Sequence, residues 1–425
     1  MKNATSGEQK LLKAAVGTAG LWVAAQIALI VYYWGAPQFT DMGGYISMAL
    51  RCFNGQEWYP AAEDVYSYFI WAPGYVNFLI LQLHIFGTVN FNSVLSLLFN
   101  IAMLFEVYYL GKKFFSTRTG LISAIIFCLM HSNLFIVTGA YTETPFMFLC
   151  LSALCLVVSG KWKYIIAAAA LFALANWIRP LVIIFLFAAV LYFIFTKAKL
   201  HNYAALAVPY ILILLLIGAA TERKIGHFVF QSTTSGFNLL MAANDEATGT
   251  VKTQAKALFI ENNESLTFAE KDSIWKGRAH KWIKENPVKF TGLYLLKIPG
   301  LYGHDIWAHM AHLESRGANA FEVMASAGEK DKKNSYIKQM INKMLISVPY
   351  YLSFIFAFYA AWINRKKLFS VKSIFPAIFI AGTLITCIYP VAFRYHYPFM
   401  FTVIIYAAWG VDTLFQKTAA RRDIR

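Results

Sequence analysis

Long apolar runs with few polar interruptions recur along the whole chain. Each is close to the roughly 20 residues that an α-helix needs to cross the hydrocarbon core of a bilayer. We therefore expect membrane-spanning helices along most of the sequence. The ten clear runs lie at residues 14–34, 93–111, 119–137, 144–159, 164–178, 181–196, 203–220, 339–362, 372–391 and 397–414.

The segment from Pro73 to Phe86 decides the orientation of every later run. It is short for a span and contains Gln82 and His84. If it crossed the membrane, the basic clusters of the short loops would lie outside, whereas basic residues favour the cytoplasmic side. If it is interfacial or re-entrant, they lie inside, and we adopt this interpretation. The clusters are at residues 112–118, 161–163, 197–199, 364–367 and, in the tail, 421–425.

Residues 164–196 form one apolar stretch with basic residues at both ends. As a single helix, its 33 residues would measure about 50 Å, against roughly 30 Å of hydrocarbon. Both ends can be cytoplasmic only if the stretch crosses twice, so we predict a turn near residues 176–180, where Pro180 can restart a helix. The expected fold class is an all-α polytopic membrane protein of about ten transmembrane helices, with both termini in the cytoplasm.

Two large loops then face the extracytoplasmic side, at residues 35–92 and 221–338. In the first, apolar positions 46, 49, 50 and 53 predict one face of a short helix lying on the membrane surface. In the second, residues 279–297 predict two amphipathic helices broken at Asn286-Pro287, with lysines suited to anionic headgroups. We divide the chain into an N-terminal transmembrane module (1–220), the large loop (221–338) and the C-terminal helices with their tail (339–425).

The composition agrees with a membrane protein. The chain is 58% hydrophobic and 14% charged, with a mean hydropathy of +0.51, whereas roughly a quarter of the residues of a soluble protein are charged. Five basic segments that contribute to the net charge of +16 are expected in the cytoplasm, and we expect no nucleic-acid partner. The lysine-rich N-terminus precedes a run that is too long for a cleaved signal peptide, so we expect a retained first span in the plasma (inner) membrane. The cysteines show no disulfide or metal spacing.

Acidic and basic side chains next to the outer ends of the spans are the candidates for chemistry. Asp41 follows the first span by seven residues, and Glu143 lies in the outer loop between the third and fourth spans. Two acids at one membrane face can share catalytic and substrate-orienting roles. Arg394 lies just before the last span on the outer side, where an arginine is unusual and suits a phosphate. Small polar residues, among them Asn238 and Asn244, open the second loop and suit hydrogen bonds to a sugar.

At these residues the chain resembles the integral-membrane glycosyltransferases of the GT-C fold, in the style of the protein mannosyltransferases and the bacterial aminoarabinose transferases. The resemblance rests on the order of weak motifs and covers most of the chain. These motifs are Asp41 in the first outer loop, Pro73-Gly74-Tyr75, the Glu143 loop, residues 175–180, residues 234–238, residues 285–290 and the Arg394 segment.

The resemblance implies an inverting transfer of a sugar from a polyprenyl-phosphate donor to a hydroxyl of a protein, glycolipid or polysaccharide. Asp41 would take the acceptor proton, and Glu143 would orient the acceptor or hold a sugar hydroxyl. Arg394, with His396 and Lys297 behind it, would bind the lipid phosphate, while Tyr45, Asn238 and Asn244 would contact the sugar. Many relatives carry paired acids in the first loop, but Met42 follows Asp41 here, and one acid holds Mg²⁺ or Mn²⁺ poorly. We therefore assign no metal ligand and no cofactor, and the polyprenyl-phosphate sugar enters as the donor substrate.

Three alternatives remain from the sequence. A flippase or transporter of lipid-linked sugars would use charges inside the membrane, and Glu106 is an acid well inside a predicted span. The chain shows no related halves, which are common in transporters. An O-antigen ligase or polymerase would act on diphosphate-linked donors, and a structural scaffold would leave the acid-bearing first loop without a role. The absence of a nucleotide-binding motif argues against direct use of a nucleotide sugar.

Overall fold

The computed structural model describes residues 6–38, 40–310, 341–367 and 369–422 of the 425-residue chain. Residues 311–338 of the predicted second loop and residues 423–425 of the predicted tail lie outside this part. Within it the protein is helical, and the strand-like pairing is one isolated bridge between Thr250 and Val391.

The helices follow the apolar pattern of the sequence, and each of the ten predicted runs contains one. They are α1 (Ser6–Tyr33), α2 (Thr40–Asn54), α3 (Pro73–Phe86), α4 (Asn92–Phe114), α5 (Thr117–Leu129), α6 (His131–Phe135), α7 (Glu143–Val157), α8 (Trp162–Ile178), α9 (Val182–Phe195), α10 (Leu200–Ile225), α11 (Ser235–Ala242), α12 (Phe268–Glu285), α13 (Pro287–Tyr302), α17 (Val348–Ile363), α18 (Ile374–Thr386) and α19 (Met400–Arg422). Two 3-10 segments matter below, η1 (Ala62–Tyr66) and η8 (Phe393–Phe399).

In the part of the chain that the structure describes, fewer than ten helices are long enough to cross a membrane unaided. In the described ranges, four helical segments combine the required length and apolarity, residues 7–33, 89–114, 200–225 and 393–418. The pair α5 and α6 adds a fifth if its 65° bend lies within one span. The other apolar helices have 10–17 residues, or roughly 15–26 Å at 1.5 Å per residue. The class of polytopic helical protein is thus confirmed, while the count of ten spans stays a prediction.

The bend between α5 and α6 is held by buried amides. The Asn100 side chain of α4 donates to Gln26 Oε1 of α1 (2.7 Å) and to the Asn133 carbonyl (2.6 Å). The Asn133 side chain in turn donates to the Phe127 carbonyl (2.8 Å), near the end of α5. A helix broken inside a membrane protein frees backbone groups that must find partners within the protein. These amides provide them.

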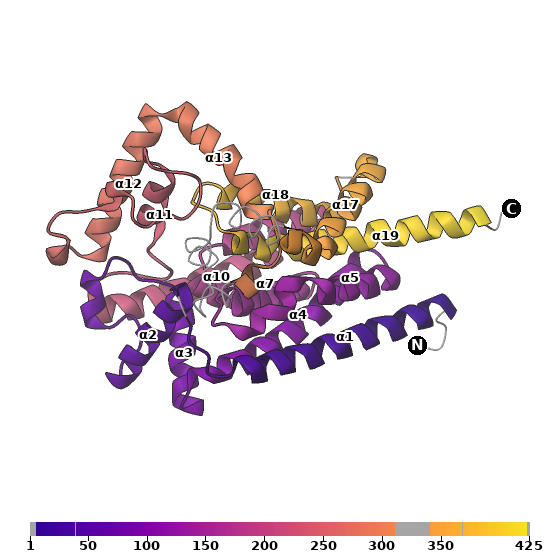
Figure 1. The fold of residues 1–425 in the computed structure, drawn as a ribbon, viewed down its shortest axis with the longest axis horizontal. Coiled ribbons are helices and arrows are strands. Elements are labelled where there is room, and N and C mark those ends of the chain that lie inside the picture. The colour runs from indigo at the N-terminus through magenta and orange to yellow at the C-terminus, as the bar shows by residue number, and fades with distance from the viewer. Residues whose placement is uncertain (1–5, 39, 311–340, 368, 423–425) are drawn as a thin grey trace, which may run out of the picture.

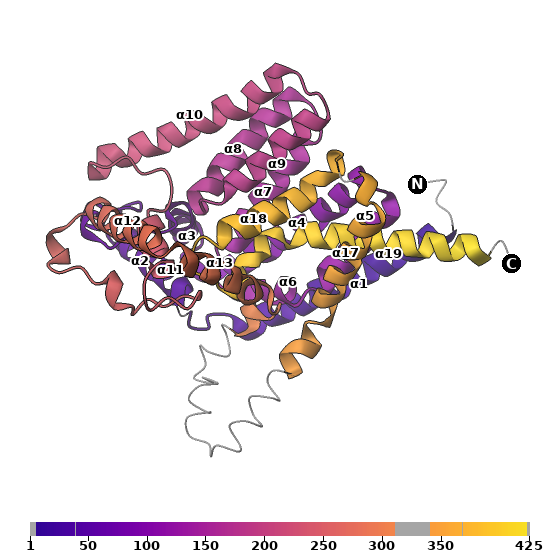
Figure 2. The same cartoon turned by 90° about the horizontal axis from the view of Figure 1, so that it is seen from above.

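The helices form a bundle whose two ends carry different parts of the chain. Figures 1 and 2 both show the N- and C-termini at one end, and α2, α3, α11 and α12 at the other. Inside the bundle, α8 packs between α7 and α10, and α19 packs against α5 and α17. A second, smaller apolar core lies under α11 and α12 around Trp275. The end with α2, α3, α11 and α12 also carries the loops that contain the candidate site residues predicted from the sequence.

The helices of the two outer loops agree in large part with prediction. The break at Asn286 separates α12 from α13, as expected. The short helix of the first loop is α2, which starts earlier than expected, at Thr40, so that Asp41 lies in its first turn. The buried side of α2 is formed by Met42, Tyr45, Ala49 and Cys52. Of the predicted apolar positions, Ala49 is buried, Ile46 and Phe53 are partly buried against the core, and Leu50 is exposed.

Close backbone approach fixes α3 against the bundle. A Cβ atom on Gly74 would lie 2.8 Å from the carbonyl carbon of Trp177 and 2.9 Å from the nitrogen of Ile178. Such distances exclude any larger residue without movement of the backbone. Gly74 therefore lets the start of α3 press against the end of α8, next to the residues described below.

Candidate active site

Four charged residues from four distant parts of the chain meet at the end of the bundle that carries the outer loops. Asp41 lies in the first turn of α2 and Glu143 in the first turn of α7. Arg179 immediately follows α8, and Arg394 lies in η8, just before α19. Because successive helices run in opposite directions, the starts of α2 and α7 lie near the end of α8 and the segment that precedes α19. We call Asp41, Glu143, Arg179 and Arg394 the charged cluster.

Acids and arginines alternate within the charged cluster. The Arg394 guanidinium donates through Nη2 to the Asp41 carboxylate, and its Nε lies 3.7 Å from Glu143 Oε1. Arg179 forms an ion pair with Glu143 and donates to the Thr142 hydroxyl (3.0 Å). Thr142 donates to the other Glu143 oxygen (3.1 Å). Two carboxylates thus face two guanidiniums, and the formal charge of the cluster is zero.

Burial divides the charged cluster into an inner and an outer part. The Glu143 side chain is only 2% exposed, whereas Asp41 is 31% and Arg394 is 21% exposed. A buried carboxylate is stable only when paired, and Glu143 has two arginines and a hydroxyl around it. Among the residues that the structure describes, Asp41 forms its ion pair with Arg394, and its carboxylate is partly exposed. The Asp41–Arg394 pair is therefore the part that an incoming substrate can reach.

Aromatic rings surround the charged cluster. Tyr395 lies between the two arginines, with its ring centre 5.7 Å from the Arg179 guanidinium and 5.5 Å from that of Arg394. Tyr45 of α2 packs on Trp71 and Tyr75, with ring centres 4.5 and 5.4 Å apart. Burial raises the pKa of the Tyr45 phenol well above its ordinary value, although the nearby Arg179 opposes the shift. The phenol therefore stays neutral and can donate a hydrogen bond.

The structure brings together four of the residues that the sequence singles out, namely Asp41, Glu143, Arg394 and Tyr45. Arg179 was missed as a site residue because it lies in a predicted turn between two spans. The available signal was its position, since an arginine at the outer end of a span is as unusual as Arg394.

Lys297 lies outside the charged cluster. It is buried on α13, where its ammonium donates to the carbonyl of Cys387 (3.0 Å) just beyond the end of α18. Burial lowers the pKa of this ammonium from its ordinary 10.5 to about 8. A cation beside free carbonyls at a helix C-terminus stabilises that helix end. The predicted contact of Lys297 with a lipid phosphate stays untested.

His396 is on η8 with Arg394 but is completely buried. Its Nδ1 lies 2.7 Å from the Leu301 carbonyl, and its Nε2 lies 3.8 Å from the Asp305 carboxylate. Asp305 also accepts from the Ser132 backbone (3.2 Å) at the start of α6. His396 therefore ties η8 to its surroundings from behind, while Arg394 faces the charged cluster.

The two asparagines predicted to contact a sugar lie on and after α11. The side chain of Asn244 is buried and donates to the Leu240 (2.8 Å) and Met241 (3.2 Å) carbonyls, and its oxygen accepts from the Glu246 backbone (2.8 Å). The Asn244 side chain therefore caps the C-terminal end of α11. Asn238 is half-buried within α11. These contacts of Asn244 are thus local to α11, and the predicted contact of both asparagines with a sugar stays untested.

The acids of the charged cluster do not fit a divalent cation, because each is paired with a guanidinium. Within the described residues, no group of three or more His, Cys, Asp or Glu side chains is arranged to hold a metal ion.

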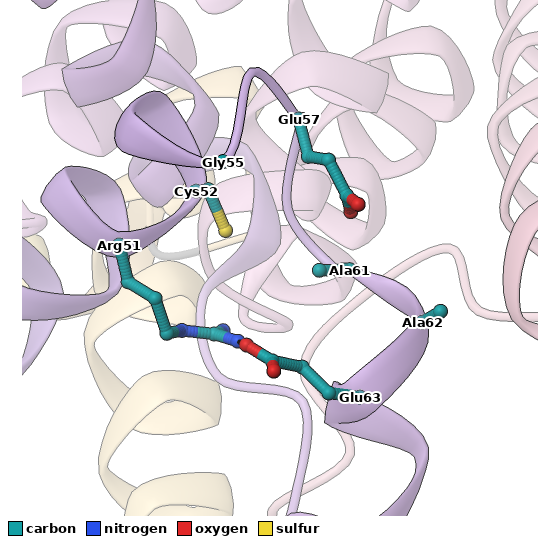
Figure 3. A pocket seen from close by; sticks show the side chains of 7 residues that line it. All are labelled: Arg51, Cys52, Gly55, Glu57, Ala61, Ala62 and Glu63. Carbon is teal, nitrogen blue, oxygen red and sulfur yellow. Dashed lines mark ion pairs between the residues drawn. The ribbon is translucent and has the colours of Figure 1, made fainter.

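A pocket of about 310 Å³ lies at the opposite end of α2 from Asp41. Figure 3 shows the Arg51–Glu63 ion pair beside it, with Cys52 and Glu57 on its walls. Arg51 also pairs with Asp64 (2.6 Å). None of the predicted site residues lines this pocket, so it does not mark the charged cluster.

Comparison with known proteins supports the resemblance seen in the sequence. Residues 72–221 match the family described as dolichyl-phosphate-mannose-protein mannosyltransferase. The matched part runs from α3 into α10 and so includes Glu143 and Arg179. No curated protein matches the chain.

The whole bundle resembles a solved membrane enzyme. The apo crystal structure of the oligosaccharyltransferase of Archaeoglobus fulgidus matches with a TM-score of 0.50 and 12% identity over 96% of this chain and 51% of that one. The same enzyme in complex with an inhibitory peptide and a dolichol-phosphate matches with a TM-score of 0.49 and 13% identity, over 96% and 51% of the two chains. The chain spans about half the length of these structures. It is thus a helical membrane protein with the GT-C fold that the sequence resemblance predicts, and its residues 72–221 are similar to the mannosyltransferase family.

Proposed function

We propose that the protein is an inverting glycosyltransferase that moves a sugar from a polyprenyl-phosphate donor to an acceptor hydroxyl on the extracytoplasmic face of the membrane. The observation that carries the proposal is the charged cluster. It joins a solvent-facing carboxylate to an arginine at one end of a membrane-embedded bundle. A carboxylate can accept a proton, and a guanidinium matches a phosphate. The similarity to a family that uses dolichyl-phosphate-mannose makes this substrate class the natural one.

In the proposed reaction, the acceptor oxygen attacks the anomeric carbon while Asp41 takes the acceptor proton. The bond between that carbon and the phosphate oxygen breaks, and its electron pair leaves with the phosphate. Arg394 stabilises the negative charge that develops on the leaving phosphate, which is where electrostatic catalysis is most effective. The leaving group needs no proton, so one carboxylate is sufficient.

Glu143 receives a different role from the one that the resemblance implies. Its carboxylate is buried between Arg179 and Arg394, which leaves little room for an acceptor or a sugar hydroxyl. We infer that Glu143 is a positioning residue that orients both guanidiniums. For Tyr45, on the same helix as Asp41, we keep the predicted role of contacting the sugar.

The acid inside the bundle does not favour a transporter. Ser152 of α7 donates a hydrogen bond to Glu106 of α4, so this carboxylate links two neighbouring helices. The O-antigen ligase alternative differs in its diphosphate donor and is separated from the proposal by experiment.

The test is sugar transfer by the purified protein in detergent. Radiolabelled polyprenyl-phosphate and polyprenyl-diphosphate sugars are supplied with a membrane extract as acceptor. We expect transfer from a monophosphate donor, with a loss of about 10²- to 10⁴-fold in Asp41→Asn, the usual contribution of a general base. Glu63→Gln removes an acid from the same loop, outside the charged cluster, and should transfer like the wild type. Transfer from diphosphate donors alone, or from none by folded protein, would refute the proposal.

A further inference from the structure

The charged cluster has a net charge of zero before any substrate binds. Its two carboxylates and two guanidiniums balance, and its half-buried Arg394 is already paired with Asp41. A donor phosphate brings one more negative charge. It can reach Arg394 closely only by replacing a carboxylate, because like charges in one site repel each other.

The geometry shows which of the two carboxylates can lose its contact with Arg394 when a phosphate binds. Glu143 is held by Arg179, by Thr142 and, at 3.7 Å, by Arg394, and its side chain is 2% exposed. To make room for a phosphate, Glu143 would have to leave Arg179 as well as Arg394, and separating a buried ion pair is costly. Asp41 is 31% exposed, and water can solvate its carboxylate once Arg394 leaves it. Because water reaches this part-exposed ion pair and screens it, breaking the pair costs less than breaking the buried pair of Glu143 and Arg179.

We propose that the Asp41–Arg394 ion pair is a latch that the donor phosphate opens, so that Asp41 becomes a free base only after the donor has bound. The inference rests on the proposed function and adds an order of events to it. Before the donor binds, the Asp41 carboxylate is occupied by Arg394. When the phosphate takes Arg394, the carboxylate is released beside the anomeric carbon, ready for the acceptor hydroxyl.

The same latch explains how the product leaves. During transfer the acceptor proton moves to Asp41, and the C–O bond to the phosphate breaks with its electron pair on the phosphate. The protonated Asp41 is neutral and no longer attracts the Arg394 guanidinium, so Arg394 stays paired with the lipid phosphate. When Asp41 returns its proton to water, its carboxylate pairs with Arg394 again and displaces the lipid phosphate.

A measurable consequence follows for Asp41→Asn. The asparagine has the shape of the aspartate without its charge, so it cannot compete with a phosphate for Arg394. We expect it to bind a lipid phosphate more tightly than the wild type, by about three- to tenfold, as one part-exposed ion pair allows. A carboxylate that served only as a base would leave this affinity unchanged.

The experiment is a titration of the wild type, Asp41→Asn and Glu63→Gln with undecaprenyl phosphate. The proteins are held in phosphatidylcholine nanodiscs, and binding is followed by native mass spectrometry. Glu63 lies on the same outer loop, pairs with Arg51 and is 67% exposed, so its variant gives the same change in net charge outside the charged cluster.

The expected result is tighter binding by Asp41→Asn and wild-type binding by Glu63→Gln. Equal or weaker binding by Asp41→Asn overturns the latch but leaves the proposed function standing. Equal tightening in both variants also overturns it, because the cause would then be general electrostatic attraction. Failure of all three proteins to bind the lipid phosphate overturns the proposed function together with the latch.

Discussion

The buried pair of Glu143 and Arg179 gives a prediction whose size can be worked out from the structure. At about 4 Å and an effective dielectric constant near 20, two unit charges attract by roughly 4 kcal/mol. Removing one partner of such a pair strands the other charge in the interior and typically costs about 3–5 kcal/mol. We expect Glu143→Gln, which leaves Arg179 without its acid, to destabilise the protein by this amount. Arg179→Met should cost less, because Glu143 keeps Arg394 at 3.7 Å.

The double variant Glu143→Gln/Arg179→Met should behave differently. With both charges gone, no buried ion lacks a partner, and replacing a whole buried pair by neutral side chains is often close to neutral. The double variant should therefore be no less stable than either single variant.

The assay is the free energy of unfolding in detergent, measured by denaturant titration of the wild type, the two single variants and the double variant. Each difference from the wild type gives one side of a double-mutant cycle. If the destabilisation of the double variant equalled the sum of the single values, Glu143 and Arg179 would not form an energetic unit. Our assignment of Glu143 as a positioning residue would then be wrong.

Three further predictions concern residues around the bundle. Arg394→Lys keeps the charge but loses the planar guanidinium that reaches both acids, and kcat/KM for transfer should fall about tenfold or more; an unchanged value would exclude Arg394 from the phosphate site. The pKa of Lys297 is lowered to about 8 in the folded protein, so between about pH 8 and its ordinary 10.5 only the unfolded chain holds the proton, and stability rises with pH there. The unfolding midpoint of the wild type should therefore rise relative to that of Lys297→Met across this window, and a constant difference would contradict it. Asp412 of α19 accepts from Arg118, Ser116 and Thr119 at the start of α5 (2.9–3.0 Å). Asp412→Asn should lower the free energy of unfolding by about 3 kcal/mol without changing the donor KM, and a changed KM would contradict a purely structural role.

The helices could be predicted from the sequence because apolar residues in a membrane protein form long uninterrupted runs. The break after Ile178 also follows from the sequence, since Pro180 cannot continue a helix that is too long for one span. The sequence did not show that several helices are too short to cross unaided. It also could not show the bend between α5 and α6, because the amides of Gln26, Asn100 and Asn133 that hold it are far apart in the chain.

The charged cluster was predictable only in part. Asp41, Glu143 and Arg394 could be placed at one end of the bundle, because topology alone sets the side on which each loop lies. Which side chain pairs with which depends on tertiary packing, so the link of Arg179 to Glu143 was not foreseen. His396 was grouped with Arg394 because it is two residues away, but successive residues of a 3-10 helix point in different directions. Its side chain therefore enters the core.

The anomeric configuration of the transferred sugar tests the central claim most directly. Asp41 as a base implies one displacement, so a product formed from a polyprenyl-phosphate sugar of known configuration should have the opposite configuration, as read by NMR. Retention of configuration would mean two displacements through a covalent sugar on the protein, with Asp41 as the exposed nucleophile. That result would contradict both its role as a base and the single-step transfer.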